Sequence, residues 1–294
     1  VAIMMALACP EVIVEAITVV AGNVPLPQAS VNARWTLETC RASDVPVHEG
    51  CDRPWLQEPA TAEWFHGSDG MGDRHYPAPR REAEPMHAVE ALIERCGARP
   101  GEITLVTLGP LTNIATALAI APALADQVAH CYVMGGAACT HGNVTPAAEY
   151  NVWCDPEAAQ RVLASGMPLT LVGWELSCGG ATLSEEEMAA LRRCDTPRSR
   201  LALDSNATAL RASRELQGQT GLALADPVAM AIALDRTIAV ERARCFVEIS
   251  TERGPTRGMT VVDRLAVTDR EPNAEVCFAI DVARWKQLLF EALG

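Results

Sequence analysis

The alternation of short apolar runs with longer helical patterns constrains the fold of this chain more than any other feature. Four short runs, rich in β-branched or other apolar residues, occupy residues 15–21, 103–108, 127–134 and 169–172. Short buried strands separated by helix-length segments are typical of parallel sheets with crossover helices. The sequence therefore predicts an α/β fold with a mainly parallel central sheet flanked by helices.

Each of these four runs ends at or near a glycine or an asparagine. The first run ends at Gly22-Asn23, the second at Gly109, the third at Gly135 and the fourth near Gly173. The carboxyl ends of parallel strands meet at one edge of an open sheet, and ligands bind there. The repeated turns therefore predict one shared crevice.

The chain is predicted to form a single open domain over residues 1–294. Its hydrophobic content of 49% is enough for a sizeable core, and no Gly/Ser linker divides it. Residues 51–79 are rich in Pro, Trp, His, Asp and Gly, which predicts an active-site loop or lid. The patterns at residues 244–249 and 259–262 predict a late antiparallel addition, and residues 282–293 predict a closing helix.

Net charge and cysteine content narrow the class of partner. A formal net charge of −13 argues against binding to nucleic acid or to an anionic membrane, so a small neutral ligand fits better. The 11 cysteines are odd in number and show no zinc-type spacing, which favours reduced thiols in a cytoplasm. We therefore expect a cytoplasmic protein with a small-molecule substrate, no nucleic-acid partner and no membrane partner.

The chain opens on an apolar helical run at residues 1–8, and no strand or capping residue precedes it. A signal-peptide core is the alternative interpretation, but no basic residue comes before the run and no small-residue cleavage site is evident after it. We favour the body of a first helix whose opening strand lies upstream. The sequence is then a domain truncated at its N-terminus.

The densest group of polar side chains lies in a turn-rich loop at residues 142–159. Asn143, Glu149 and Asn151 place two carboxamides and a carboxylate close together in the sequence. Carboxamides donate and accept hydrogen bonds and a carboxylate accepts them, which suits the adjacent hydroxyls of a sugar. Trp153, beside Asn151, is interpreted equally well as a core residue. The loop predicts a polyol-binding site.

Other candidate positions have ordinary structural explanations when each is taken alone. Asn23 follows the first run and is also a typical turn residue. Asp226 precedes an apolar helix and is also a typical helix N-cap. Residues 66–72 combine an imidazole, an acid and three glycines, and a flexible loop explains them equally well. Trp174 and Trp285 are expected in the core or in a lid.

In combination, these segments resemble the inosine-uridine-preferring nucleoside hydrolases. The resemblance runs from residue 1 to about residue 235, and its segments occur in the order and spacing of that family. The segments are Val19-Val20-Ala21-Gly22-Asn23, Leu108-Gly109-Pro110-Leu111-Thr112-Asn113-Ile114-Ala115, Met134-Gly135-Gly136, Gly142-Asn143, Ala148-Glu149-Tyr150-Asn151 and Asp155-Pro156-Glu157-Ala158-Ala159.

The resemblance implies an enzyme that hydrolyses the N-glycosidic bond of ribonucleosides to ribose and free base, as in purine and pyrimidine salvage. Family members use a tightly bound Ca²⁺ that ligates the attacking water and the ribose 2′- and 3′-hydroxyls. A hard cation of this kind lowers the pKa of a bound water and orients the diol. On this resemblance the Asp226 carboxylate and the backbone carbonyl of Leu108 are the metal ligands.

The same resemblance implies a set of ribose contacts. Asn23, Asn143, Glu149 and Asn151 would bind the hydroxyls, with Met134 lining the sugar pocket. Asn143, Glu149 and Asn151 would also be catalytic, because their contacts help to stabilise the oxocarbenium-like ribosyl cation. Soluble members of the family form dimers or tetramers, so a homodimer or homotetramer is implied as well.

Two departures from the family pattern affect the expected activity. The Asp-x-Asp-x-Gly-x-Asp-Asp motif, which supplies most of the calcium carboxylates, belongs just upstream of Val1 and is not in this sequence. We therefore expect the 294-residue chain on its own to be inactive. Ala225 stands where many members carry a His that protonates the purine. Activation of the leaving group must then come from another group, from solvent or from stacking on an aromatic such as Trp153, which places inosine in doubt as the preferred substrate.

A catalytically silent nucleoside-binding or regulatory protein of the same fold is the alternative function. The missing aspartate motif and the missing His before Asp226 both fit this alternative. The upstream coding sequence discriminates between the two functions. An aspartate motif there favours the enzyme, and an authentic start at Val1 favours the silent protein.

Overall fold

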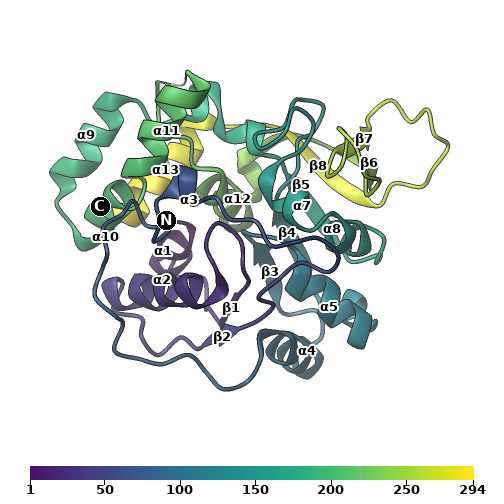
Figure 1. Cartoon of the computed structure of the whole chain (residues 1–294), viewed down its shortest axis with the longest axis horizontal. Coiled ribbons are helices and arrows are strands. Elements are labelled where there is room, and N and C mark those ends of the chain that lie inside the picture. The colour runs from purple at the N-terminus through teal and green to yellow at the C-terminus, as the bar shows by residue number, and fades with distance from the viewer. Residues whose placement is uncertain (219) are drawn as a thin grey trace.

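A six-stranded sheet lies at the centre of the molecule (Figure 1). The computed structural model describes residues 1–218 and 220–294. The strands lie in the order β3-β4-β5-β8-β6-β7; neighbours from β3 to β8 are parallel, and β6 is antiparallel to β8 and to β7. This arrangement confirms the mainly parallel sheet and its late antiparallel addition. The strands are β3 (Thr104–Thr107), β4 (His130–Met134), β5 (Leu169–Val172), β6 (Ala239–Ile249), β7 (Thr260–Asp263) and β8 (Ala274–Ile280).

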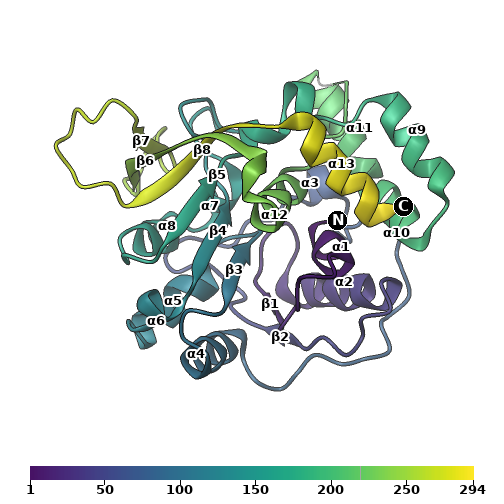
Figure 2. The ribbon, with the colours of Figure 1, turned by 180° about the vertical axis from the view of Figure 1, so that it is seen from behind.

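Helices cover both faces of this sheet (Figures 1 and 2). Side chains alternate along β4, so that Tyr132 and Met134 join one core while Cys131 and Val133 join the other. The first core contains α1, α10, α12 and α13, and the second contains α4, α5, α6 and α8. The helices are α1 (Ala2–Ala8), α2 (Leu26–Thr39), α3 (Glu63–His66), α4 (Ala88–Ala98), α5 (Thr112–Ile120), α6 (Leu124–Gln127), α7 (Tyr150–Cys154), α8 (Pro156–Leu163), α9 (Glu185–Cys194), α10 (Pro197–Asp204), α11 (Ala207–Gln217), α12 (Ala225–Leu234) and α13 (Val282–Leu293), with 3-10 turns η1 (Trp174–Ser177), η2 (Gly179–Ala181) and η3 (Arg236–Ile238).

The first predicted strand does not join the central sheet. β1 (Ile17–Val19) pairs in parallel with β2 (Val47–Glu49) and forms a separate two-stranded sheet. The Val19 carbonyl accepts hydrogen bonds from the Asn113 side chain of α5 at 2.9 Å and from the Gly50 amide at 2.9 Å. At the end of β1, the backbone is therefore bound by a side chain and a loop amide and not by a further strand.

The two terminal helices confirm their sequence predictions. Residues 1–8 were predicted as the body of a first helix, and α1 spans Ala2–Ala8 and packs against α12 and α13. The closing helix is α13, in which the Trp285 side chain is fully buried and its Nε1 donates to the Ala181 carbonyl at 3.2 Å. None of the helices in the described part of the chain has both the length and the apolar character to span a bilayer.

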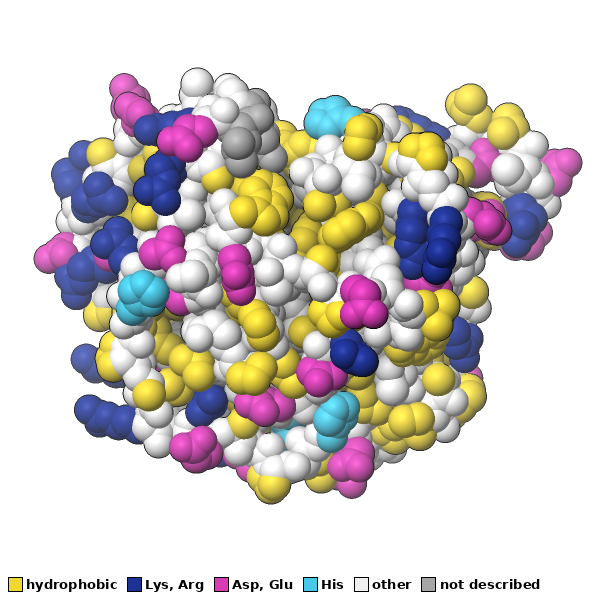
Figure 3. All heavy atoms as spheres, in the orientation of Figure 1, with side chains coloured by type: hydrophobic (Ala, Val, Ile, Leu, Met, Phe, Trp, Pro, Cys, Tyr) yellow, Lys and Arg dark blue, Asp and Glu magenta, His cyan; other side chains and the backbone are white. Residues whose placement is uncertain are grey.

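One segment projects from the rest of the molecule. Strand β7 and residues 263–273 extend to one side in both ribbon views (Figures 1 and 2). Leu265 and Val267 in this segment are 82% and 75% exposed. Figure 3 shows Lys and Arg side chains gathered over α9 and α10 at the other side, with few at the centre of this face.

Candidate active site

A cavity of about 230 Å³ opens at the carboxyl ends of several strands. Leu108 follows β3, Met134 ends β4, Trp174 follows β5 and Asn23 lies shortly after β1, and all four residues line the cavity. The turns at the strand ends therefore do meet at one crevice, as the sequence predicted. This arrangement explains why residues far apart in the sequence contribute to a single site.

Glu149 is the most tightly held polar side chain of the cavity. It caps α7, where its Oε1 accepts from the Asn151 amide at 3.0 Å and its Oε2 accepts from the Gly136 and Val152 amides at 2.8 and 3.2 Å. The residue is 2% exposed, and this burial raises the pKa of its carboxyl to about 7 although the amide donors lower it. The carboxylate is thus fixed in place and titrates near neutral pH.

Asn143 and Asn151 flank Glu149 and have complementary free groups. The Asn143 Oδ1 accepts from the Tyr150 amide at 2.9 Å, which leaves its amide nitrogen to donate. The Asn151 Nδ2 donates to the Met134 carbonyl at 3.2 Å, which leaves its carbonyl oxygen to accept. Both residues line the cavity. Together they offer one donor and one acceptor to a ligand that carries hydroxyl groups.

Asp226, Leu108 and Asn23, three further predicted site residues, also line the cavity. Burial raises the pKa of the Asp226 carboxyl to about 6, and none of the described residues donates a hydrogen bond to it. The side chain of Asn23 is exposed to the cavity. Val1, the first residue of the sequence, lines the cavity as well. The Asp226 carboxylate therefore has free acceptor capacity.

The residues that could hold a metal ion are few. Asp226 supplies one carboxylate and Leu108 supplies a backbone carbonyl in the same cavity. Within residues 1–218 and 220–294, no group of three or more His, Cys, Asp or Glu side chains is arranged to hold a metal ion. A calcium ion takes about six to eight oxygen ligands. The described acidic side chains alone therefore do not form a complete site for such an ion.

Trp153 is the one predicted site residue that the structure does not bring into the cavity lining. It is not among the described residues that line the cavity; it packs with Val144, Cys154 and Tyr150, whose ring lies 6.2 Å from the indole. Its indole is packed in this small cluster beside the cavity. Trp174, expected in the core or in a lid, is the tryptophan that follows β5 and lines the cavity.

A second part of the lining comes from the segment at residues 51–79, predicted as an active-site loop or lid, and from α11, which sequence reasoning missed. Trp64, Phe65 and His66 of α3 contribute to it, together with Asn206, Ala209 and Ser213 at the start of α11 and along it. Burial lowers the pKa of His66 to about 4, so its imidazole is neutral at pH 7. The glycines after His66 were a signal for this loop, but nothing local indicated that it faces α11.

Ala225 lies where the sequence placed it, before Asp226 and in the lining of the cavity. Its methyl group has no proton to donate to a leaving group. Among the described residues that line the cavity, His66 is the one imidazole. Because Ala225 has no proton to donate, His66 is the imidazole of the described lining that could contact a departing base.

The chain is similar to known proteins over nearly its whole length. A family model described as inosine-uridine preferring nucleoside hydrolase matches residues 1–287. The pyrimidine-specific ribonucleoside hydrolase RihB of Escherichia coli (strain K12) is 34% identical over 283 residues, which cover 96% of this chain and 88% of that protein. The plant nucleoside hydrolase PpNRh1 superposes with a TM-score of 0.94 at 32% identity, covering 99% of this chain and 94% of that one. A purine-preferring ribonucleoside hydrolase from Gardnerella vaginalis gives a TM-score of 0.92 at 29% identity, covering 99% and 93%.

Proposed function

We propose that the cavity binds the ribose of a ribonucleoside through Asn23, Asn143, Glu149 and Asn151. The proposal starts from the family: this chain belongs to the inosine-uridine preferring nucleoside hydrolases. The protein is an enzyme that hydrolyses the N-glycosidic bond of ribonucleosides. Its matched relatives are ribonucleoside hydrolases, so the alternative of a catalytically silent protein is not favoured. The observation that supports the ribose site best is the Glu149 carboxylate, held by three backbone amides beside two asparagines.

In this proposal Glu149 stabilises the reacting sugar. Cleavage of the glycosidic bond develops positive charge on the ribosyl ring, and a fixed carboxylate in a buried site stabilises that charge. The three amide donors prevent the side chain from turning away, so it does not have to reorganise during the reaction. Its ionised form is the active one, because only that form carries the charge that opposes the cation.

Asn143 and Asn151 orient the sugar in this proposal. The free amide nitrogen of Asn143 donates to one hydroxyl oxygen, and the free carbonyl of Asn151 accepts from a hydroxyl proton. Neighbouring hydroxyls of ribose both donate and accept, so the pair suits a diol. Met134 supports this arrangement, because its carbonyl binds the Asn151 amide.

The family is metal-dependent in general, and the ion in our proposal is Ca²⁺. Asp226 and the Leu108 carbonyl would hold it, a role that suits a buried carboxylate to which no described residue donates a hydrogen bond. When bound, the ion supplies a water of lowered pKa and a template for the hydroxyls. The described acidic side chains alone do not form a complete site for it.

His66 is proposed to contact the base. It is the imidazole of the cavity lining in the described part of the chain, and Ala225 supplies no proton. A neutral imidazole donates one N–H, which suits a carbonyl or ring nitrogen of a base as it leaves. Because the matched relatives include both a pyrimidine-specific and a purine-preferring enzyme, the proposal assigns no single base.

We also propose a cytoplasmic homodimer or homotetramer. The 11 cysteines are odd in number and show no zinc-type spacing, which fits reduced thiols in a reducing compartment.

The oligomer is proposed from the family resemblance alone, and light scattering on the purified protein measures it. A monomeric mass at working concentration would contradict it.

The ribose site is tested in the full-length protein as its gene encodes it. Ribose release from uridine and from inosine is measured for wild type and for Asn143→Ala, Glu149→Ala and Asn151→Ala. We expect each variant to lose turnover for both nucleosides, since each contact is proposed to the shared sugar. Loss for one nucleoside and not for the other would place the changed residue at the base and contradict the proposal.

A further inference from the structure

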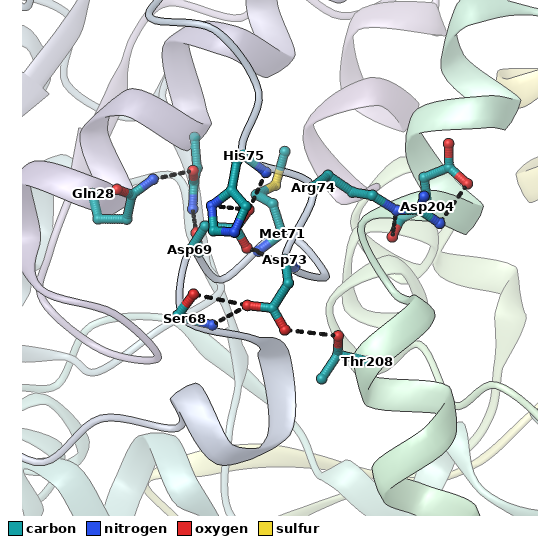
Figure 4. Close-up of polar contacts among 10 residues, drawn as sticks. Gln28, Ser68, Asp69, Met71, Asp73, Arg74, His75, Asp204 and Thr208 are labelled. Carbon is teal, nitrogen blue, oxygen red and sulfur yellow. Dashed lines mark hydrogen bonds and ion pairs between the residues drawn. The ribbon is translucent and has the colours of Figure 1, made fainter.

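The loop at residues 67–75, which we call the Asp69 loop, is wound around one buried carboxylate (Figure 4). Asp69 is 7% exposed, and its Oδ1 accepts from the Met71 amide at 2.7 Å and from the Asp73 amide at 2.9 Å. Its Oδ2 accepts from the His75 amide at 2.7 Å. One side chain therefore satisfies three backbone donors of its own loop.

The backbone of the Asp69 loop adopts an unfavourable conformation that depends on that carboxylate. Asp73 and His75 adopt left-handed φ angles of 56° and 48°, which are unfavourable for a residue with a Cβ. The amides of these same two residues are bound to Asp69. Their hydrogen bonds to the carboxylate offset the strain, so the shape of the loop depends on Asp69.

The loop docks against the junction of α10 and α11. The Asp73 Oδ2 accepts from the Thr208 hydroxyl of α11 at 3.4 Å, while its Oδ1 is held by the Ser68 amide at 2.7 Å. A Cβ at Gly72 would lie 2.4 Å from the Asp204 carbonyl, so the backbone approaches the end of α10 closely. Figure 4 shows Asp73 between Ser68 and Thr208.

Two further contacts hold the loop from either side. The Arg74 guanidinium lies 3.2 Å from the Asp204 carboxylate of α10. The Asn32 side chain of α2 donates to the Asp69 carbonyl at 2.8 Å. The loop therefore bridges α2 to the α10–α11 junction.

His66, just before the loop, and α11, on which the loop docks, both contribute to the cavity lining. His66 immediately precedes the loop, and its carbonyl accepts from the Gly72 amide at 3.0 Å. Helix α11, reached through Thr208, carries Ala209 and Ser213 of the cavity lining. Helix α3, which ends at His66, packs directly against α11, and the loop adds a second connection between them. None of the described residues from 67 to 75 lines the cavity.

We propose that Asp69 and Asp73 are positioning residues that hold His66 in a fixed relation to α11 and so assemble the base-contacting part of the cavity before substrate arrives. The inference rests on the proposed contact between His66 and the base. Neither aspartate touches substrate. Their effect reaches the reaction through the imidazole, so it appears only when the leaving group needs that imidazole.

The test compares two kinds of leaving group in the full-length protein. The p-nitrophenyl riboside releases a stable anion that needs no help at the base side, whereas uridine and inosine do need it. For Asp69→Ala we expect kcat/KM to fall about tenfold or more for the nucleosides and less than about twofold for the p-nitrophenyl riboside, because a displaced group loses its productive geometry. A merely structural role would lower both substrates in parallel.

Asp263→Ala is the matched control. Asp263 holds a loop in the same way, accepting from the Val267 amide at 3.0 Å and from the Thr268 amide at 2.8 Å, but in the projecting segment. We expect it to leave kcat/KM unchanged for both kinds of substrate. A selective loss in this variant would overturn the assignment to the Asp69 loop.

A milder pair of variants keeps the test decisive where Asp69→Ala does not fold. Thr208→Val removes only the hydroxyl that binds Asp73, and Thr208→Ser keeps it. We expect about a threefold selective loss for nucleosides in the first variant and recovery in the second, in line with one lost hydrogen bond. Equal behaviour of the two variants overturns the positioning role.

His66→Ala separates this inference from its premise. If this variant shows no selective loss, the proposed role of His66 is wrong and the inference falls with it. If His66→Ala is selective while neither Asp69→Ala nor Thr208→Val is, His66 keeps its role and the positioning proposal alone is overturned.

Discussion

Glu149 and Asp69, in two regions of the molecule, are held by the same kind of hydrogen bonding. Each is almost fully buried, and each carboxylate accepts hydrogen bonds from three backbone amides. Of the two, Glu149 alone is among the described residues that line the cavity. Its donors come from α7 and from Gly136 after β4, whereas the donors to Asp69 come from its own loop.

Because Glu149 lines the cavity and Asp69 does not, a carboxylate bound by backbone amides is not by itself a sign of catalysis. Glu149 lies beside the end of a parallel strand, where the sheet opens, so its carboxylate faces a ligand. Asp69 lies between a short helix and the α10–α11 junction, so its carboxylate serves the backbone. The same chemistry thus gives a proposed catalytic group in one place and a proposed positioning group in the other.

The largest effect is expected on the Glu149 side of this comparison. Glu149→Ala should lower kcat about a hundredfold or more for nucleosides and for the p-nitrophenyl riboside alike, because the lost contact strengthens in the transition state. Rates of ribose or p-nitrophenol release measure it, and a melting curve checks the fold. Near-normal turnover would remove Glu149 from the site and end the contrast with Asp69.

The pH profile sharpens the same contrast. Burial raises the pKa of Glu149 to about 7, so its ionised fraction should fall about tenfold per pH unit below that value. We expect kcat/KM to show this acid limb in wild type and in Asp69→Ala, since the group that titrates is unchanged. A flat profile between pH 5 and pH 8, measured with the p-nitrophenyl riboside, would contradict an essential ionised Glu149.

His66→Ala tests the group that Asp69 is proposed to position. We expect kcat/KM to fall about tenfold for uridine or inosine and hardly at all for the p-nitrophenyl riboside, because only the bases need a hydrogen bond or a proton to leave. Wild type should itself prefer the activated riboside to inosine, since Ala225 supplies no acid. A preference for inosine together with unchanged rates in His66→Ala would assign the leaving-group role to another residue.

Stability separates the Asp69 loop from the projecting Asp263 loop. Asp69→Ala leaves three amides without their acceptor in a partly buried place, so the free energy of unfolding should fall by about 2 kcal/mol. Asp263→Ala acts in an exposed segment where water replaces the lost acceptor, and about 1 kcal/mol or less is expected. Urea unfolding of both variants measures the difference, and equal losses would contradict it.

Asp226 is a third carboxylate to compare with these two, and none of the described residues donates a hydrogen bond to it. With Leu108 it offers two ligands where calcium takes about six to eight, so the smallest effect is expected here. Calcium should stabilise the 294-residue chain by about 1 kcal/mol or less, and Asp226→Asn should abolish that gain. Tight binding by this chain in calorimetry would mean that other carboxylates build the site.

Much of the proposed site was predictable from local sequence. The strand ends, the glycines after them and the acidic residue at the start of α7 are local features, and the resemblance set them in order. The structure brings seven of the eight predicted side chains or carbonyls to one cavity: Asn23, Leu108, Met134, Asn143, Glu149, Asn151 and Asp226. These positions follow from strand ends and helix starts, which short-range physics determines.

The strand and helix pattern, the mainly parallel sheet and the polar loop at residues 142–159 are all predictable from local sequence. Which side chains face the cavity depends on how distant segments pack. Trp153 packs in a small cluster with Val144 and Tyr150. His66 lies near α11 because α3 packs directly against that helix, and the contact between Asp73 and Thr208, 135 positions apart in the sequence, is a further link. The physical reason is that hydrogen bonds within a helix or turn are encoded locally, whereas the packing of distant segments depends on all of them at once.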